Sequence, residues 1–351
     1  MSLYTKLYIA NTGMITAIGA NTEMTLDATR AGINRYKESI VHNKQYKPIN
    51  LALIPESALP EFNEGLENKG LPTRQRRMLK MSEVALTECL ANTNFKSPLP
   101  LFLAVPEVIP NSINKPMSNK FIDQLSIQAG IEIDIANSRM FELGRAGGFH
   151  ALDYAFKYLE HTKQDYALLG GIDSYLDLAL LSTLDKDQRI RADEVMDGFI
   201  GGEAACFILL ASERIKELAG KNAYVFKPGL ADEEGHRYSD NIYKGDGLDN
   251  AFKNALQQAD GITVNAIFSS LNGESLSIKE CSVASMRNKN LIDENALTEH
   301  PADCFGDVGA AFGPLLLALT SLNIKKGHIQ APCLAYSSSD TSYRGAAQVS
   351  I

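Results

Sequence analysis

Short apolar runs alternate with longer amphipathic stretches along the first part of the chain. Residues 74–90 carry apolar side chains near helical spacing, and a shorter helix is expected at residues 23–30. Uninterrupted apolar runs of strand length indicate strands that are buried on both faces, as in a sheet covered by helices. Such runs lie at residues 7–10, 101–105, 166–169 and 204–210, and the third is expected to end at Gly170 and Gly171.

A second series of elements begins near residue 223. Its expected members are strands at 223–226 and 265–269, a helix at 248–259, a helix that opens at 305–313 and runs to about Leu322, and a last strand at 346–351. Strands that alternate with helical stretches predict a parallel, layered α/β sheet.

Two glycine-rich segments open helices in the same way. Residues 144–148 and 305–313 both place small residues ahead of an apolar helix, which lets a helix start press against other backbone. The similarity hints at an internal duplication. No Gly/Ser or Pro tract separates the two series around residues 213–221, so we expect halves at 1–220 and 221–351 that share an interface.

Composition excludes several classes of function. Of the 351 residues 45% are hydrophobic, which is enough for a sizeable core, and the net charge of -8 argues against nucleic-acid and anionic-membrane partners. No apolar run approaches the roughly 18 residues of a membrane helix, and Met1 to Lys6 lack the apolar core of a signal peptide. The five cysteines are scattered without metal-binding spacing, so we expect reduced thiols, a cytoplasmic location, and no metal or cofactor.

Six segments follow one another in a recognisable order. Residues 9–19 contain a strand and a Thr-Gly turn, and residues 76–82 form a basic helix. Residues 167–174 form a strand with a Gly-Gly-x-Asp motif, and residues 197–205 contain an Asp-Gly-Phe-x-x-Gly-Glu pattern. The last two segments are residues 244–248 and 306–313. In this order and spacing the chain resembles the β-ketoacyl synthase family along nearly its whole length. The resemblance implies the thiolase fold: two duplicated α/β halves in five layers, α-β-α-β-α. It also implies a dimer that pairs an edge strand near Met140 with its twin.

The resemblance also implies where the chemistry should lie. The family condenses acyl groups with a cysteine thiolate assisted by two histidines, or by a histidine and an asparagine. These positions correspond here to Arg145, Asn272 and Asp307. A guanidinium has no usable lone pair and forms no acyl-enzyme. Residues 134–165 contain no cysteine, and Ser138 lies on the wrong side of the strand candidate.

Each of these three residues also has a purely structural interpretation. Arg145 is a surface arginine in that reading, Asn272 a turn residue before Gly273, and Asp307 a helix N-cap. A cation at a helix start opposes the helix dipole and needs a partner. We therefore expect an ion pair between Arg145 and Asp307, which is compatible with capping.

The remaining candidates have simpler explanations. His150 is expected to be packed and hydrogen-bonded, and Cys304 to be a buried inert thiol. The mixed charges at 185–191 are typical of a solvated face. The helix group of Arg74, Arg76, Arg77 and Lys80 is basic enough to meet an acidic carrier protein. The family's late Gly-Phe-Gly-Gly turn is altered at 341–345.

Three hypotheses about function follow. The first is a ketosynthase-like protein of fatty acid or polyketide type metabolism that lacks condensing activity. It would act as a homodimer, or as a heterodimer with an active ketosynthase in the manner of a chain-length factor, with an acyl carrier protein as a possible further partner. The second is an enzyme that acts on an acyl or carboxylate ligand through Arg145. The third is a 3-oxoacyl synthase that works through unrecognised residues. The fold alone does not choose among them.

Overall fold

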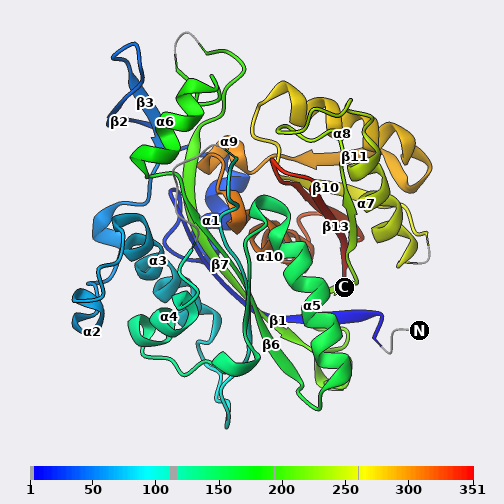
Figure 1. Cartoon of the computed structure of the whole chain (residues 1–351). Coiled ribbons are helices and arrows are strands. Elements are labelled where there is room, and N and C mark those ends of the chain that lie inside the picture. Colours follow the sequence, from blue (N-terminus) through cyan, green and yellow to red (C-terminus); the bar gives the residue numbers. More distant parts are fainter. Residues whose placement is uncertain (1–3, 111–116, 193–194, 260) are drawn as a thin grey trace.

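A continuous mixed sheet runs through the centre of the protein. The computed structural model describes residues 4–110, 117–192, 195–259 and 261–351, so Met1 to Leu3 lie outside it. The strand order is β11-β10-β12-β13-β8-β1-β7-β6-β4-β5; β2 and β3 form a side hairpin on β7, and β9 pairs with β13 (Figure 1).

The strands and helices have the following bounds. The strands are β1 (Lys6–Thr16), β2 (Lys37–His42), β3 (Pro48–Ala52), β4 (Leu101–Ala104), β5 (Arg139–Phe141), β6 (Tyr166–Ser174), β7 (Gly201–Ala211), β8 (Tyr224–Phe226), β9 (Gly229–Asp232), β10 (Val264–Ser269), β11 (Ile292–Glu299), β12 (Cys333–Ser338) and β13 (Tyr343–Ser350). The helices are α1 (Thr22–Arg30), α2 (Glu64–Glu67), α3 (Thr73–Cys89), α4 (Phe121–Ala129), α5 (Gly147–His161), α6 (Leu178–Lys186), α7 (Asp246–Gln257), α8 (Ser275–Arg287), α9 (Ala302–Phe305) and α10 (Phe312–Lys325). Two 3-10 turns, η3 (Gly144–Ala146) and η6 (Gly309–Ala311), lead directly into α5 and α10.

The sheet consists of two copies of one strand pattern. The order β5-β4-β6-β7-β1 in the first copy corresponds to β11-β10-β12-β13-β8 in the second. In each copy the first three strands are parallel and the last two pairings are antiparallel. The copies meet where β1 pairs with β8. The expected duplication is therefore confirmed.

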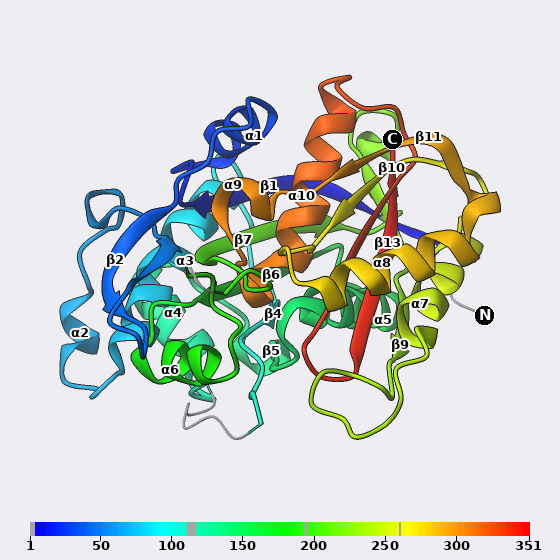
Figure 2. The ribbon, with the colours of Figure 1, turned by 90° about the horizontal axis from the view of Figure 1, so that it is seen from above.

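Helices form three layers around the two half-sheets. In Figure 1, α3 and α4 cover the outer face of the first half, and α7 and α8 cover that of the second. Between them α5 and α10 pack against strands of both halves, and Figure 2 shows the same arrangement from above. Helix α10 is buried almost throughout, which explains why its sequence is apolar on all sides. The five-layer thiolase arrangement is thus as expected.

The two central helices cross at glycine. A Cβ atom on Gly148 would lie 2.8 Å from the Cα of Gly313 and 2.5 Å from the Cδ of Pro314, closer than atoms can approach. The small residues at both helix starts are therefore required by backbone contact, as the sequence predicted. This crossing brings the starts of α5 and α10 side by side.

Strands β1 and β6 are longer than the sequence predicted. Strand β1 continues through the expected Thr-Gly turn at Thr12 and Gly13 to Thr16. Strand β6 does not end at Gly170 and Gly171 but continues to Ser174. Gly171 lies against α10, where a Cβ atom would come 2.7 Å from the carbonyl oxygen of Ala310. The glycines thus provide close contact within the strand rather than a turn. Within the described ranges, no helix has the length and apolar character to cross a membrane, and no group of side chains is arranged to hold a metal ion.

Candidate functional site

Arg145 and Asp307 form the expected ion pair at the starts of the central helices. Arg145 lies in η3, and Asp307 precedes η6. The Nε of Arg145 lies 2.8 Å from Oδ2 of Asp307, and an Nη atom lies 2.5 Å from the same oxygen. The residues are 4% and 1% exposed. The surface interpretation of Arg145 is therefore wrong. Both hydrogen bonds converge on one oxygen, so the geometry is not the parallel two-oxygen form.

The carboxylate of Asp307 is also saturated by neutral donors. Its Oδ1 accepts the N–H of Gly309 at 2.8 Å and the hydroxyl of Tyr175 at 3.3 Å. Its Oδ2 accepts the amide of Asn272 at 2.8 Å. The expected helix N-cap is not formed, because Val308 and Ala311 occupy the N-cap positions of η6 and α10. Asp307 instead binds the N–H of Gly309 two residues on and pairs with Arg145.

Asp340 is a second carboxylate against Arg145 that the sequence did not reveal. One Nη of Arg145 lies 2.9 Å from Oδ1 of Asp340. Arg189 donates to both oxygens of Asp340, at 2.7 and 2.9 Å, and to both oxygens of Glu274, at 2.9 and 2.8 Å. Arg189 is 3% exposed. The interpretation of residues 185–191 as a solvated face is therefore wrong for Arg189, because the chain turns back after α6 and inserts this side chain among carboxylates of the second half.

Three cations face three carboxylates in this cluster. Arg237 adds a third cation, 2.9 Å from Glu274. We call the set the charge network: Arg145, Arg189, Arg237, Asp307, Asp340 and Glu274. Burial alone would lower the pKa of Arg145, but Asp307 and Asp340 outweigh it and hold that pKa well above its ordinary value. Burial likewise opposes ionisation of Asp340, but Arg145 and Arg189 hold its pKa well below its ordinary value.

Asn272 serves the turn and the charge network together. Gly273 has a positive φ of 97°, as the Asn-Gly turn predicted. The Oδ1 of Asn272 accepts the N–H of Glu274, and its Nδ2 donates to Glu274 and Asp307. Both hydrogens of the amide are thus occupied.

Little free space remains beside Arg145. The cavity that Arg145 shares with Glu107 and Asp173 has about 20 Å³, which is room for a single water. A cavity of about 410 Å³ lies beyond Asn272 and Asp307, and one of about 390 Å³ lies beside Arg237. No cysteine or histidine among the described residues lines any of them.

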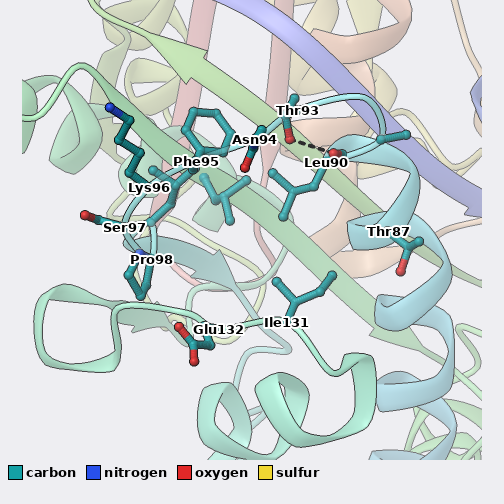
Figure 3. Close-up of a pocket in the computed structure, with 13 residues that line it drawn as sticks. Thr87, Leu90, Thr93, Asn94, Phe95, Lys96, Ser97, Pro98, Ile131 and Glu132 are labelled. Atoms are coloured by element: carbon teal, nitrogen blue, oxygen red, sulfur yellow. Dashed lines mark hydrogen bonds between the residues drawn. The ribbon is translucent and has the colours of Figure 1, made fainter.

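A further cavity lies away from this site. It has about 510 Å³ and is enclosed by the last turn of α3, the loop at residues 93–99 and the segment after α4 (Figure 3). Leu90, Phe95 and Ile131 form apolar walls, while Lys96 and Glu132 are exposed. It shares no lining residue with the charge network.

The other predicted residues are structural. Cys304 is buried, as expected, and its thiol faces the carbonyl of Thr29 at 3.9 Å. Burial raises its pKa, which disfavours the reactive thiolate. His150 packs edge-on against Tyr343, but its Nε2 has no hydrogen-bond partner among the described residues, so the expected hydrogen bond is missing there. The hydroxyl of Ser138, just before β5, donates to the carbonyl of Asp134 and accepts the N–H of Leu101 in β4.

The basic group on α3 is neutralised within the protein. Arg74 bonds Asp173 at 2.7 Å, and Arg77 bonds both oxygens of Glu203, which is fully buried. Lys80 pairs with Glu56, and Arg76 with Glu67. The Gly-Gly-x-Asp and Gly-Gly-Glu motifs therefore supply anchors that fasten α3 to the sheet. Most of this positive charge is paired with acidic side chains of the same protein. Little of it is therefore left to attract an acidic carrier protein here.

Solved structures of ketosynthases share this architecture. No protein-family model and no curated protein matches the sequence. The structure is similar to that of the ishigamide ketosynthase/chain length factor, at a TM-score of 0.76 and 15% identity, with 99% of both chains covered. A ketosynthase in complex with its chain length factor from Xenorhabdus doucetiae gives 0.74 and 14%, over 99% of this chain and 98% of that one. A β-ketoacyl synthase from Burkholderia phymatum STM815 gives 0.70 and 14% over 99% of both chains. The chain thus has the ketosynthase form of the thiolase fold.

Proposed function

We propose that this protein is a ketosynthase-like subunit of fatty acid or polyketide type metabolism that lacks condensing activity and assists an active ketosynthase. The observation that carries the proposal is the charge network at the starts of α5 and α10. The resemblance places the nucleophile at Arg145 and the two assisting groups at Asn272 and Asp307. All three side chains are engaged with one another or with neighbouring carboxylates.

Condensation needs a thiolate, room for a thioester and donors for an enolate oxygen. Arg145 supplies no lone pair, and the space beside it is about 20 Å³. The amide hydrogens of Asn272 are occupied. The ionised Asp307 would repel an enolate rather than stabilise it.

The two alternatives have less support. A ligand carboxylate would have to compete for Arg145, whose guanidinium already donates to Asp307, Asp340 and Tyr175. A synthase that works through another thiol would need an accessible cysteine, but all five are buried. Burial raises the pKa of Cys304, the one closest in sequence to Asp307.

The loss of activity is tested with malonyl- and acyl-carrier thioesters. Carbon dioxide release and intact mass are measured on the protein alone, with an active ketosynthase as the positive control. We expect neither decarboxylation above the rate without protein nor a covalent adduct. A stable acyl adduct on any cysteine would contradict the proposal and favour a synthase with unrecognised residues.

The proposal includes a dimer through β5, a cytoplasmic location and a division of the chain at residue 220. Strand β5 ends the strand order, so its outer edge has no partner strand within the described chain. Phe141 uses its carbonyl for the N–H of Val105. Because backbone groups alternate along a strand, those of Met140 point outward and are available to a second chain.

The partner role is tested by co-expression with an intact ketosynthase from the same organism. Light scattering after gel filtration is expected to show a one-to-one complex, and the length of the products is compared with that from the ketosynthase alone. A ketosynthase that forms no complex and makes the same products would contradict a subunit role.

A further inference from the structure

Helix α8 contributes few buried side chains to the core. It lies on the outer face of the second half (Figure 1), and of its 13 residues Glu280, Cys281 and Ala284 are buried. The neighbouring α7, with 12 residues, buries seven. The apolar core of the second half receives Cys281 and Ala284 from α8. Apolar burial therefore stabilises the position of α8 only weakly.

Ion pairs hold α8 at two points instead. Directly before the helix, Glu274 bonds Arg189 and Arg237 at 2.8 and 2.9 Å. Farther along the helix, Glu280 lies 2.7 Å from the Nε of Arg344, and both of these side chains are at most 5% exposed. The docking of α8 on the protein thus depends on charged contacts.

Arg344 also joins α8 to the turn between β12 and β13. One Nη of its guanidinium donates to the carbonyls of Ser339, Thr341 and Tyr343, at 2.9, 2.7 and 2.9 Å. A single side chain therefore gathers three carbonyls of the turn and at the same time pairs with Glu280 on the helix. An outward movement of the turn would pull on α8 through this side chain.

Polar contacts also fasten the turn to the first half of the chain. Asp340 bonds Arg145 and Arg189 at 2.9 and 2.7 Å. The carboxyl group of Glu107, just after β4, accepts the N–H groups of Asp340 and Thr341 at 3.1 and 3.2 Å. The apolar clusters of the described chain include no side chain of this turn. Like α8, the turn is held by charges and hydrogen bonds.

We infer that α8 and the turn form one cover over the charge network and that the two segments open together. The cover consists of residues 274–287 and 339–344. It carries Glu274 and Asp340, two of the three carboxylates of the charge network. When the cover opens, these carboxylates leave the arginines of the first half, which then meet water. This opening is independent of whether the protein has a catalytic or a partner role.

Salt is expected to favour the open cover. Opening separates charged groups and exposes them to water, where dissolved ions screen them. Raising sodium chloride from about 0.1 M to about 1 M shortens the screening length from about 10 Å to about 3 Å. The dry pairs of the closed cover gain little from this screening. Helix α10 is held by apolar burial, so its opening should not increase with salt.

Hydrogen exchange measured by mass spectrometry on the full-length protein at pH 7 tests the cover. Peptides from α8 and from the turn should report the same free energy of opening. Exchange in both should rise by the same factor, about 5-fold, over this range of salt, while exchange in α10 does not rise.

A change of Arg344 tests the link between the two segments. Arg344→Met removes charge-assisted hydrogen bonds and should raise exchange in α8 and in the turn by about 10- to 150-fold. Glu280→Gln keeps a hydrogen-bond acceptor and should raise both by less. Arg214→Met, which breaks an exposed pair with Asp165, is the matched control and should leave both unchanged. Normal protection in β6 and β7 shows that each variant folds.

Three results would overturn the inference. The first is a different free energy of opening for α8 and for the turn in the wild-type protein. The second is exchange in the cover that does not respond to salt. The third is a loosening of the turn alone in both Arg344→Met and Glu280→Gln, because the link between the two segments would then be absent.

Discussion

Removing Arg145 and removing Asp307 are expected to lower the stability of the protein by different amounts. In Arg145→Met, Asp307 loses the only cation that it contacts among the described residues and keeps neutral donors from Asn272, Tyr175 and Gly309. In Asp307→Asn, by contrast, Arg145 keeps a carboxylate. The two halves of one pair should therefore have unequal effects on the free energy of unfolding.

The magnitudes follow from what each variant leaves behind. An unpaired carboxylate that is 1% exposed is expected to cost about 3–5 kcal/mol. Asp307→Asn leaves Arg145 bonded to Asp340 at 2.9 Å, so the loss is that of charge-assisted hydrogen bonds, about 1.5–3 kcal/mol. The double variant should cost less than the sum, by about 1–3 kcal/mol, because its second change removes the stranded charge of the first.

Urea unfolding followed by circular dichroism measures these differences at pH 7. Arg214→Met is the matched control, because Arg214 pairs with Asp165 in an exposed bridge where both side chains are about two-fifths exposed. It is expected to cost about 0–1 kcal/mol. The reasoning fails if Arg145→Met costs no more than Arg214→Met, or if Asp307→Asn is the more harmful change.

Three further outcomes are expected. Gly148→Ala should lower the free energy of unfolding in urea by roughly 1–3 kcal/mol, because its Cβ atom would lie 2.5 Å from Pro314. Gly65→Ala, at a solvent-exposed position, should cost far less. Equal effects of the two changes would argue against a tight helix crossing. Sedimentation at micromolar concentration should show a dimer, and Met140→Pro, which removes an outward N–H on β5, should shift it to a monomer that still folds; a wild-type monomer would contradict the dimer. Alkylation of the native protein should modify its buried cysteines only after unfolding, and rapid modification of Cys304 would speak against an inert thiol.

The sequence predicted those parts of the site that rest on local motifs. The pattern around Gly148 and Gly313 sets where the two helices begin. The resemblance to the ketosynthase family implied that these two starts face each other, so Arg145 was expected beside Asp307. Opposite charges at two apposed helix starts then required a pair. Most predicted strands were correct because they are apolar on both faces.

The rest depends on distant segments that carry no periodic signal. Asp340 and Glu274 lie in turns, and nothing local indicates that they meet Arg189 from a charged stretch after α6. Two signals were present: Asp340 directly precedes the altered turn, and Arg189 adjoins the apolar Ile190. Strand β11 was missed because it is an edge strand with mostly polar, solvent-facing residues, which periodicity does not distinguish from a loop.

The shared dependence of Arg145 and Asp307 constrains how this site can evolve. A change of Arg145 to cysteine alone would give a thiol beside a carboxylate without a cation, a setting that raises a thiol pKa and destabilises the fold at once. A change of Asp307 to histidine alone would set a second basic group against Arg145. Each single step toward a nucleophilic site therefore passes through a less stable protein. A return to a catalytic site therefore requires substitution at both positions together.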